Sequence, residues 1–325
     1  MNRYVTLLKR EYWEHRGGFL WAPVWTAAAL LLMTVIGMGV ASWHANRTFD
    51  GEIRIGVPLQ KLLSEIPPDE MAKLGLGYEA GLGGFWLVMQ IVLFFVLFFY
   101  LLGALYDDRR DRSILFWKSL PVSDTDTVLS KVAVAAIGAP LLAWAVTVVL
   151  HFGFLAVLGL FVLAHGLSPM ELVWGPAEPL ALAVKLLAIV PVNALWAMPA
   201  IGWLLLVSAF ARSKPFLWAV ALPVALGVAI NTFELLEAIR VPDTWYWQHV
   251  VARILTSLVP ASWFGQAFIE RAKQTDPNGP GPEMLIDWSV IGGALGSMEL
   301  WIGVVAGVAM IAAAIHFRRT RELAD

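Results

Sequence analysis

Six histidines are the side chains of this chain best suited to acid–base chemistry or metal binding, because an imidazole does both near neutral pH. They are His15, His44, His151, His165, His249 and His316. Their spacing matches no metal-ligand pattern. The sequence contains no cysteine, which excludes disulfides, thiolate metal ligands and cysteine nucleophiles. We therefore expect no enzyme active site, no metal site and no cofactor bound by this chain.

The sequence also lacks the residues that would cradle a nucleotide phosphate. It contains no Gly-Lys pair, and the GxxxxGK[ST] phosphate loop requires one. The formal net charge of −2 says nothing about nucleic acid, because the basic residues are spread along the expected inner edge of the membrane. No nucleic-acid partner is expected.

Three polar residues lie within otherwise apolar stretches: His151, Asn193 and Asn231. His151 could contact a proton or a substrate, and the two asparagines could line a pathway. Each could instead join neighbouring helices through a hydrogen bond. The sequence shows no series of Asp, Glu and His residues through an apolar region, which disfavours an ion-coupled transporter.

Charged residues gather in one island, 106–131, between two long apolar blocks. The cluster at its start consists of Asp107, Asp108, Arg109, Arg110, Asp111 and Arg112. A short helix is expected next, with Ser113 as its N-cap and Pro121 as its stop. Its apolar residues are Ile114, Leu115, Phe116, Trp117 and Leu120.

A helix that is apolar nearly all round needs partners on two sides. We expect one side of this helix to pack on the membrane helices and the other to bind a separate protein. The alternative is that the island packs only against the N-terminal helix of its own chain. A further helix, capped by Ser123 or Asp124, is expected to lead through Lys131 into the next apolar block.

The composition places these residues in a membrane protein. Hydrophobic residues make up 59% of the 325 positions and charged residues 15%, whereas a soluble domain usually carries about a quarter charged residues. We expect a single all-α permease domain over 1–325, with spans of about 20 residues. The six predicted spans cover 20–42, 85–105, 132–164, 181–210, 216–234 and 299–317. The third and fourth exceed one bilayer crossing, so kinks are expected at Pro140, Pro191 and Pro199.

Basic residues predict that both termini are cytoplasmic. The pieces 1–19, 106–131, 211–215 and 318–325 hold 14 of the 23 Lys and Arg residues, and such an excess marks the inner side. The first piece should form an interfacial helix with one face made of Tyr4, Val5, Leu8 and Tyr12. The following apolar run is too long for a signal peptide and is expected to be an uncleaved anchor, most simply in a bacterial inner membrane.

Two long pieces, 43–84 and 235–298, are expected on the outer side. The first contains an amphipathic stretch at 57–74 and a Gly-rich return at 75–84. In the second, residues 245–259 are too polar for a confident span and suit interfacial or re-entrant helices that face protein. A loop is expected at 276–283.

An amphipathic N-terminal helix, six spans and a charged loop after the second span together resemble a type 2 ABC exporter permease. The specific match is the charged cluster at 107–112, the apolar helix at 114–117, Leu-Pro-Val-Ser at 120–123 and Lys131. Ser113 departs from the family, which often has glycine there.

The resemblance implies that the island is a coupling helix, which docks on a separate ATP-binding subunit that holds ATP and Mg. Two permease copies, as a homodimer or heterodimer, would work with two such subunits. The residues implied in coupling are Asp108, Arg109, Arg112, Ile114, Phe116, Trp117, Leu120 and Pro121.

The leading expectation is thus an exporter or lipid-extracting permease, with lipid around it and an amphipathic or lipidic cargo. The alternative is a non-transporting ABC-like scaffold that signals or drives maturation of an envelope protein through the outer segment 235–298. A secondary transporter or channel is disfavoured by the missing intramembrane charges, and an embedded enzyme by the missing catalytic residues.

Overall fold

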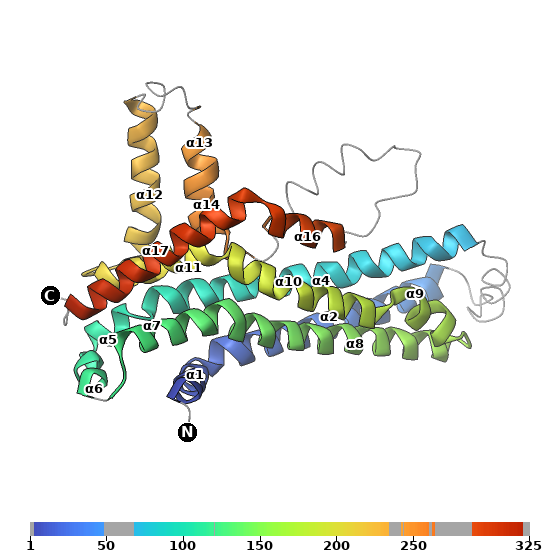
Figure 1. Cartoon of the computed structure of the whole chain (residues 1–325). Coiled ribbons are helices and arrows are strands. Elements are labelled where there is room, and N and C mark those ends of the chain that lie inside the picture. Colours follow the sequence, from blue (N-terminus) through green and yellow to red (C-terminus); the bar gives the residue numbers. More distant parts are fainter. Residues whose placement is uncertain are drawn as a thin grey trace.

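The computed structural model describes residues 3–48, 68–119, 121–233, 242, 244–259, 262–263 and 288–320. Within these ranges every regular element is a helix, so the expected all-α class is confirmed for them. The longest helices run side by side in an elongated bundle (Figure 1). The N-terminal helix α1 (Arg3–Glu14), the short helix α6 (Ser113–Ser119) and the end of α17 (Met298–Thr320) lie at one end of it.

Six helical stretches of the described chain are long and apolar enough to cross a membrane, and each overlaps one predicted span. They are Gly17–His44, Gly77–Arg110, Asp124–Ala164, Met170–Trp196, Pro215–Thr232 and Met298–Thr320. Five of them reach at least two residues beyond the apolar run at one end or both, because a helix continues into flanking polar residues whose backbone hydrogen bonds it satisfies.

The amphipathic N-terminal helix is present as α1. Of the predicted interfacial face, Tyr4, Val5 and Leu8 are exposed and Tyr12 is partly buried, whereas Leu7 and Glu11 are buried against the bundle. A π-helical turn over Gly17–Trp21 then leads into α2 (Ala22–Thr48). The first span therefore starts directly from a helix that is packed on the protein along one side.

The predicted Gly-rich return at 75–84 is wrong. Helix α4 begins at Pro68 and continues without a break to Gly103. Glycine inside a helix costs about 1 kcal/mol relative to alanine, but packing offsets this cost: Leu82 is fully buried, and the Tyr78 hydroxyl donates to Leu172 O at 2.7 Å. The second span is therefore the end of a longer helix. Most of the stretch 57–74 lies outside the described residues.

The expected irregularities in the two longest spans are present. Helix α7 (Asp124–Ala133) joins α8 (Ala139–Ala164) through a π-helical turn over Val134–Gly138, with Pro140 at the start of α8. The predicted span 181–210 is divided into two helices, α10 (Pro179–Trp196), which contains Pro191, and α11 (Met198–Phe210), which begins beside Pro199. A proline lacks the N–H that would continue the helical ladder, and two of these three positions coincide with a break. Before α10, a π-helical turn over Met170–Trp174 and α9 (Gly175–Ala177) cover the other end of the bundle.

Helix α12 (Pro215–Thr232) and the segment after it stand at an angle to the bundle in Figure 1. The return segment consists of α13 (Thr244–Tyr246), a π-helical turn over Trp247–Val251 and α14 (Ala252–Thr256). The Trp247 ring packs where a Cβ on Gly227 would lie, 2.8 Å from it. Residues 244–256 are thus helical, and Val251, Arg253 and Ile254 are buried against the protein. An interfacial or re-entrant position for this segment stays a prediction. Most of the rest of 235–298, with the loop expected at 276–283, lies outside the described residues.

The last described segment is α16 (Trp288–Gly296) followed by α17. Helix α17 packs closely on α11, and glycines make this approach possible: a Cβ on Gly307 would overlap the backbone of Met198, and a Cβ on Gly202 the backbone of Gly307. Small residues allow membrane helices to approach in this way. The contact fixes α11 and α17 against each other at the core of the bundle.

Candidate docking site at α5, α6 and α7

The charged island folds into three helices, α5 (Tyr106–Arg110), α6 and α7. Arg112 links the first two with φ 58°, a left-handed conformation that costs a non-glycine residue about 1–2 kcal/mol. The Ser113 hydroxyl donates to Asp108 O at 3.3 Å. Ser123 caps α7 as predicted, because its Oγ accepts the Asp126 N–H at 3.0 Å.

Two carboxylates of the island hold Arg318, in the last turn of α17. Arg318 Nη1 lies 3.0 Å from Asp108 Oδ2, and its Nε lies 3.1 Å from Asp124 Oδ1. The side chain of Arg318 is only 2% exposed. Two charge-assisted hydrogen bonds compensate for the burial of such a cation. The ion pairs therefore fasten α5 and α7 to the final span.

Arg109 fastens the same turn to α11. Its Nη2 donates to Ser208 O at 2.7 Å and to Ala211 O at 2.9 Å, and these carbonyls lie at the C-terminal end of α11, where backbone acceptors have no helical partner. Ser208 Oγ in turn accepts the N–H groups of Leu105 and Tyr106, each at 2.9 Å. The chain that leaves the second span is thus held at the end of α11 by the Ser208 hydroxyl and by two backbone carbonyls.

These contacts divide the charged cluster. Asp108 and Arg109 are buried, while the exposed members are Asp107, Arg110, Asp111 and Arg112. Arg110 pairs with Asp107 at 3.1 Å and with Asp111 at 2.9 Å, both at the surface. The buried pair of residues therefore anchors the island, and the others face outward around it.

Helix α6 has a buried side and an open side. Ile114 is fully buried, whereas Leu115 is 50% and Phe116 60% exposed. Pro121 is also exposed, and Leu120 lies outside the described residues. Large apolar side chains presented on a short, anchored helix are typical of a binding surface.

Trp117 connects α6 to the N-terminal helix. The guanidinium of Arg10 lies 3.4 Å from the centroid of its ring, which is a cation–π contact. The Tyr4 hydroxyl donates to Asp126 Oδ1 at 2.6 Å and so joins α1 to α7 as well. Trp117 thus packs on the N-terminal helix of its own chain, as the alternative expected for the whole island, whereas Leu115 and Phe116 remain exposed.

A buried charged cluster stands under this end of the bundle. Lys131 Nζ lies 3.1 Å from Glu11 Oε1, and the Tyr100 hydroxyl donates to Glu11 Oε2 at 2.9 Å. Burial alone would raise the pKa of Glu11, but the charge and hydrogen bonds of Lys131 and the hydrogen bond from Tyr100 together lower the pKa below its ordinary value. The carboxylate therefore stays ionised and ties α1 to α4 and α7.

A polar groove runs beside α6, between α7 and the end of α17. It has a volume of about 460 Å³. Its lining comes from all three helices and the turn between them: Trp117, Lys118, Val122, Ser123, Asp124, Thr127, Arg318 and Arg319. The exposed apolar face of α6 is therefore flanked by a concave polar surface.

The three polar residues within the spans each make a helix-joining contact. His151 Nε2 lies 2.9 Å from Leu82 O. The Trp263 indole donates to Asn193 Oδ1 at 2.8 Å, and the Trp247 indole donates to Asn231 Oδ1 at 3.4 Å. Asn193 also lines an internal cavity, and a role of any of the three residues in a pathway stays a prediction.

Among the residues of this site that were not identified from the sequence are Glu11, Tyr100, Ser208 and Arg318. The sequence did indicate that a residue such as Glu11 is needed, because Lys131 stands at the start of an apolar block and a buried cation requires an acidic partner. Choosing Glu11 among the acidic residues required the fold.

No group of three or more His, Asp and Glu side chains that could hold a metal occurs in the described part of the chain. Since six helical stretches are long and apolar enough to cross a membrane, the chain is a multi-pass membrane protein, all-helical over the described residues. It matches no protein-family model, no curated protein and no solved structure.

Proposed function

We propose that this chain is the transmembrane subunit of an ATP-driven exporter of the type 2 ABC class. In this proposal α6 is the coupling helix and docks on a separate subunit that binds ATP and Mg. The observation that carries it is the state of α6: Phe116 and Leu115 stand open on a helix whose base is fixed by Asp108 and Arg109.

The contacts of α5 support a mechanical role. A docking helix transmits force only if it is fixed to the elements that must move, and α5 is fixed to α11 and α17 through buried polar contacts. Closure of two ATP-binding subunits would then move both helices together with α6. The α6 end of the bundle would be cytoplasmic, as the distribution of Lys and Arg indicates.

The exposed apolar surface fits a second copy and lipid as further partners. Only 6% of the apolar window of the first span and 17% of that of the fifth are buried. In the proposal these sides face lipid or the second permease copy, and the pathway forms between two copies. A mostly apolar pathway of this kind suits an amphipathic or lipidic cargo.

The test is Phe116→Ala, measured as ATP hydrolysis by the purified complex with the partner subunit. Removal of an aromatic anchor costs about 2 kcal/mol, so we expect binding to the partner to weaken about 30-fold and coupled hydrolysis to fall. Phe99→Ala is the matched control, because Phe99 is 59% exposed against 60% for Phe116 but lies on the side of α4. Equal hydrolysis in both variants would refute the coupling role.

A transport assay in vesicles separates the exporter from the scaffold alternative. Both require docking at α6, but only the exporter moves an amphipathic cargo across the bilayer when ATP is added. Coupled hydrolysis without movement of any lipidic cargo from the native membrane extract would favour the scaffold.

A further inference from the structure

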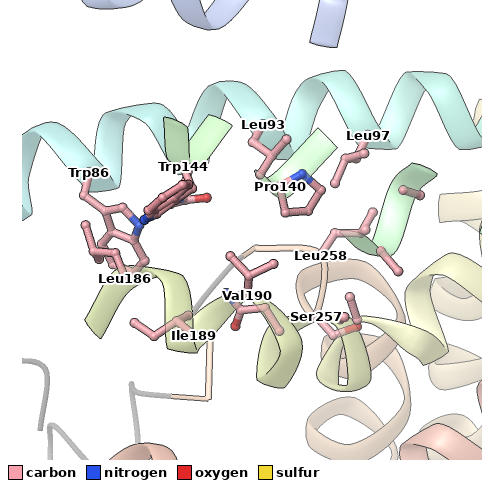
Figure 2. A pocket seen from close by; sticks show the side chains of 16 residues that line it. Trp86, Leu93, Leu97, Pro140, Trp144, Leu186, Ile189, Val190, Ser257 and Leu258 are labelled. Carbon is pink, nitrogen blue, oxygen red and sulfur yellow. The ribbon is translucent and has the colours of Figure 1, made fainter. Parts of the chain in front are cut away.

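A small cavity lies inside the bundle, and none of its lining residues belongs to α6 (Figure 2). Its wall is formed by α4, the π-helical turn before α8, the start of α8, α10 and the turn after α14. Most of this wall is apolar or aromatic, and its polar side chains include Gln90, Asn193 and Ser257. Figure 2 shows Ser257 and Leu258 on the side of the return segment.

The hydroxyl of Ser257 is buried at this cavity without a hydrogen bond. The residue is 2% exposed, and its Oγ has no partner. The neighbouring hydroxyl of Thr256 behaves differently, because it donates to Ala252 O of its own helix at 2.7 Å. A buried hydroxyl that bonds neither to protein nor to water is unfavourable. Ser257 therefore requires a partner that the cavity can supply.

Pro140 provides a second polar group at the same cavity. It stands at the start of α8, directly after the π-helical turn Val134–Gly138. A proline has no N–H, so one carbonyl of the turn before it lacks a helical donor. Ala135 and Ala136, five and four residues before Pro140, both line the cavity. In membrane helices, backbone groups that a proline frees in this way are satisfied by serine side chains or by ordered water.

The size and chemistry of the cavity limit its occupant. The volume is about 30 Å³, which exceeds the roughly 10–15 Å³ that a water needs and is too small for a sugar, a phosphate or a hydrocarbon chain. None of the lining residues is charged, so an ion would be buried without a counter-ion. A buried water requires about two to four polar partners, and the Ser257 hydroxyl and the freed carbonyl supply two.

We propose that this cavity binds an ordered water molecule, which bridges the Ser257 hydroxyl to a backbone carbonyl of the turn before Pro140. The bridge joins the return segment to the third span at the point where the helix of that span is irregular. The site lies within one subunit and uses no residue of α6. It therefore holds or fails independently of the function proposed above.

The test is X-ray radiolysis of the full chain in lipid nanodiscs, with a radical scavenger in the bulk solvent. Radiolysis converts a bound water into a hydroxyl radical, which oxidises the side chains beside it, and mass spectrometry locates the oxidised residues. We expect oxidation of Leu258, which lines the cavity and is 2% exposed. Leu150 is the matched control, because it is 0% exposed and lies outside the cavity wall. Leu258 as unmodified as Leu150 would overturn the proposal.

Ser257→Ala tests the first partner of the water. The variant removes one hydrogen bond to the water, so oxidation of Leu258 should fall about three- to tenfold. Thr256→Ala is the matched control, because it removes the adjacent hydroxyl, which is bonded within its own helix, and should leave oxidation unchanged. Equal oxidation of Leu258 in the two variants would contradict the role of Ser257.

Pro140→Ala tests the second partner. The alanine N–H can occupy the freed carbonyl, so oxidation of Leu258 should again fall about three- to tenfold. Pro223→Ala is the control, because Pro223 also lies inside a helix but does not line the cavity. Unchanged oxidation in Pro140→Ala would overturn the bridge to this turn.

Thermal stability distinguishes a hydrated cavity from a dry one. In a dry cavity, Ser257→Ala would remove an unsatisfied polar group and raise the melting temperature. In the proposed site the hydroxyl is bonded to water, so the melting temperature of Ser257→Ala should equal that of the wild type or lie below it. A higher melting temperature would overturn the proposal.

Discussion

Glu11 and Lys131 are side chains of opposite charge that the fold takes almost completely out of solvent, 1% and 3% exposed. Such a pair is weak evidence of net stability, since the cost of desolvation rivals the attraction. Removal of either side chain would nevertheless be costly, because the other charge would then be buried without a counter-ion. The N-terminal helix is therefore bound to the bundle through an ion pair that requires both of its charges.

Lys131→Met should destabilise the protein by about 3–5 kcal/mol, because the variant leaves Glu11 buried without its counter-ion. The measurement is thermal or denaturant unfolding of the purified protein in detergent. The double variant Glu11→Leu/Lys131→Met serves as the control and should recover most of the loss, because no charge then remains buried. A single variant as stable as the wild type would contradict the geometry.

The lowered pKa of Glu11 also predicts a dependence of stability on pH. A carboxyl whose folded-state pKa is below the ordinary value of 4.5 stabilises the fold above that pH, and loses this contribution as the pH falls through the folded-state pKa. The wild type should therefore lose stability below about pH 4.5 more steeply than Glu11→Gln. Parallel unfolding curves for the two proteins from pH 6 to pH 3 would argue against an ionised Glu11.

At the scale of elements, the buried polar contacts and the glycines have the same effect, since each fixes one helix to a particular neighbour. Helices α5 and α7 are fixed to α17 by Arg318, and α17 to α11 by the close approach at Gly307. Helix α12 is held both by the bundle and by the segment after it, since the Trp203 indole donates to Ala219 O and the Tyr246 hydroxyl to Pro223 O.

The α11–α17 contact predicts a sharp difference between two glycines. Gly307→Leu should destabilise by at least the 1–3 kcal/mol typical of overpacking, because even a Cβ would overlap the backbone of Met198. Gly37→Leu on α2 is the matched control, because a Cβ there meets nothing within 4 Å. The melting temperatures of the two variants provide the test, and equal values would contradict the close packing of α17 on α11.

The sequence predicted elements well and their partners poorly. Runs of apolar residues located six spans, and the three prolines anticipated two breaks, because both signals are local. The helical course of 75–84 was missed, since packing of Leu82 and Tyr78 outweighs the propensity of the glycines there. The short helix α6 was located, but the contacts of Glu11 and Arg318 were not, because their partners are 120 and 210 residues away along the chain.

At the scale of the whole molecule, the bundle has two ends that should face opposite sides of the membrane. The first carries α1, α6 and the end of α17, and the second carries the turn after α8 (Figure 1). Ser119 and Ser168 are both exposed, and they flank the third span at these two ends.

This arrangement can be tested directly, because the chain has no cysteine of its own. Ser119→Cys should react with a membrane-impermeant maleimide only from the cytoplasmic side, and Ser168→Cys only from the outer side. Both substitutions replace an exposed serine by cysteine, so a difference in reactivity shows on which side of the membrane each residue lies. Labelling of both from the same side would contradict the six-span arrangement.

The contact of Asp108 and Asp124 with Arg318 also has a consequence for synthesis. Chains emerge from the N-terminus, so the island is made long before the final span that supplies its arginine. A chain cut short before residue 298 would carry α6 with two acidic anchors and no cation between them. The contacts that fix α5 and α7 are thus completed only after α17 has been made.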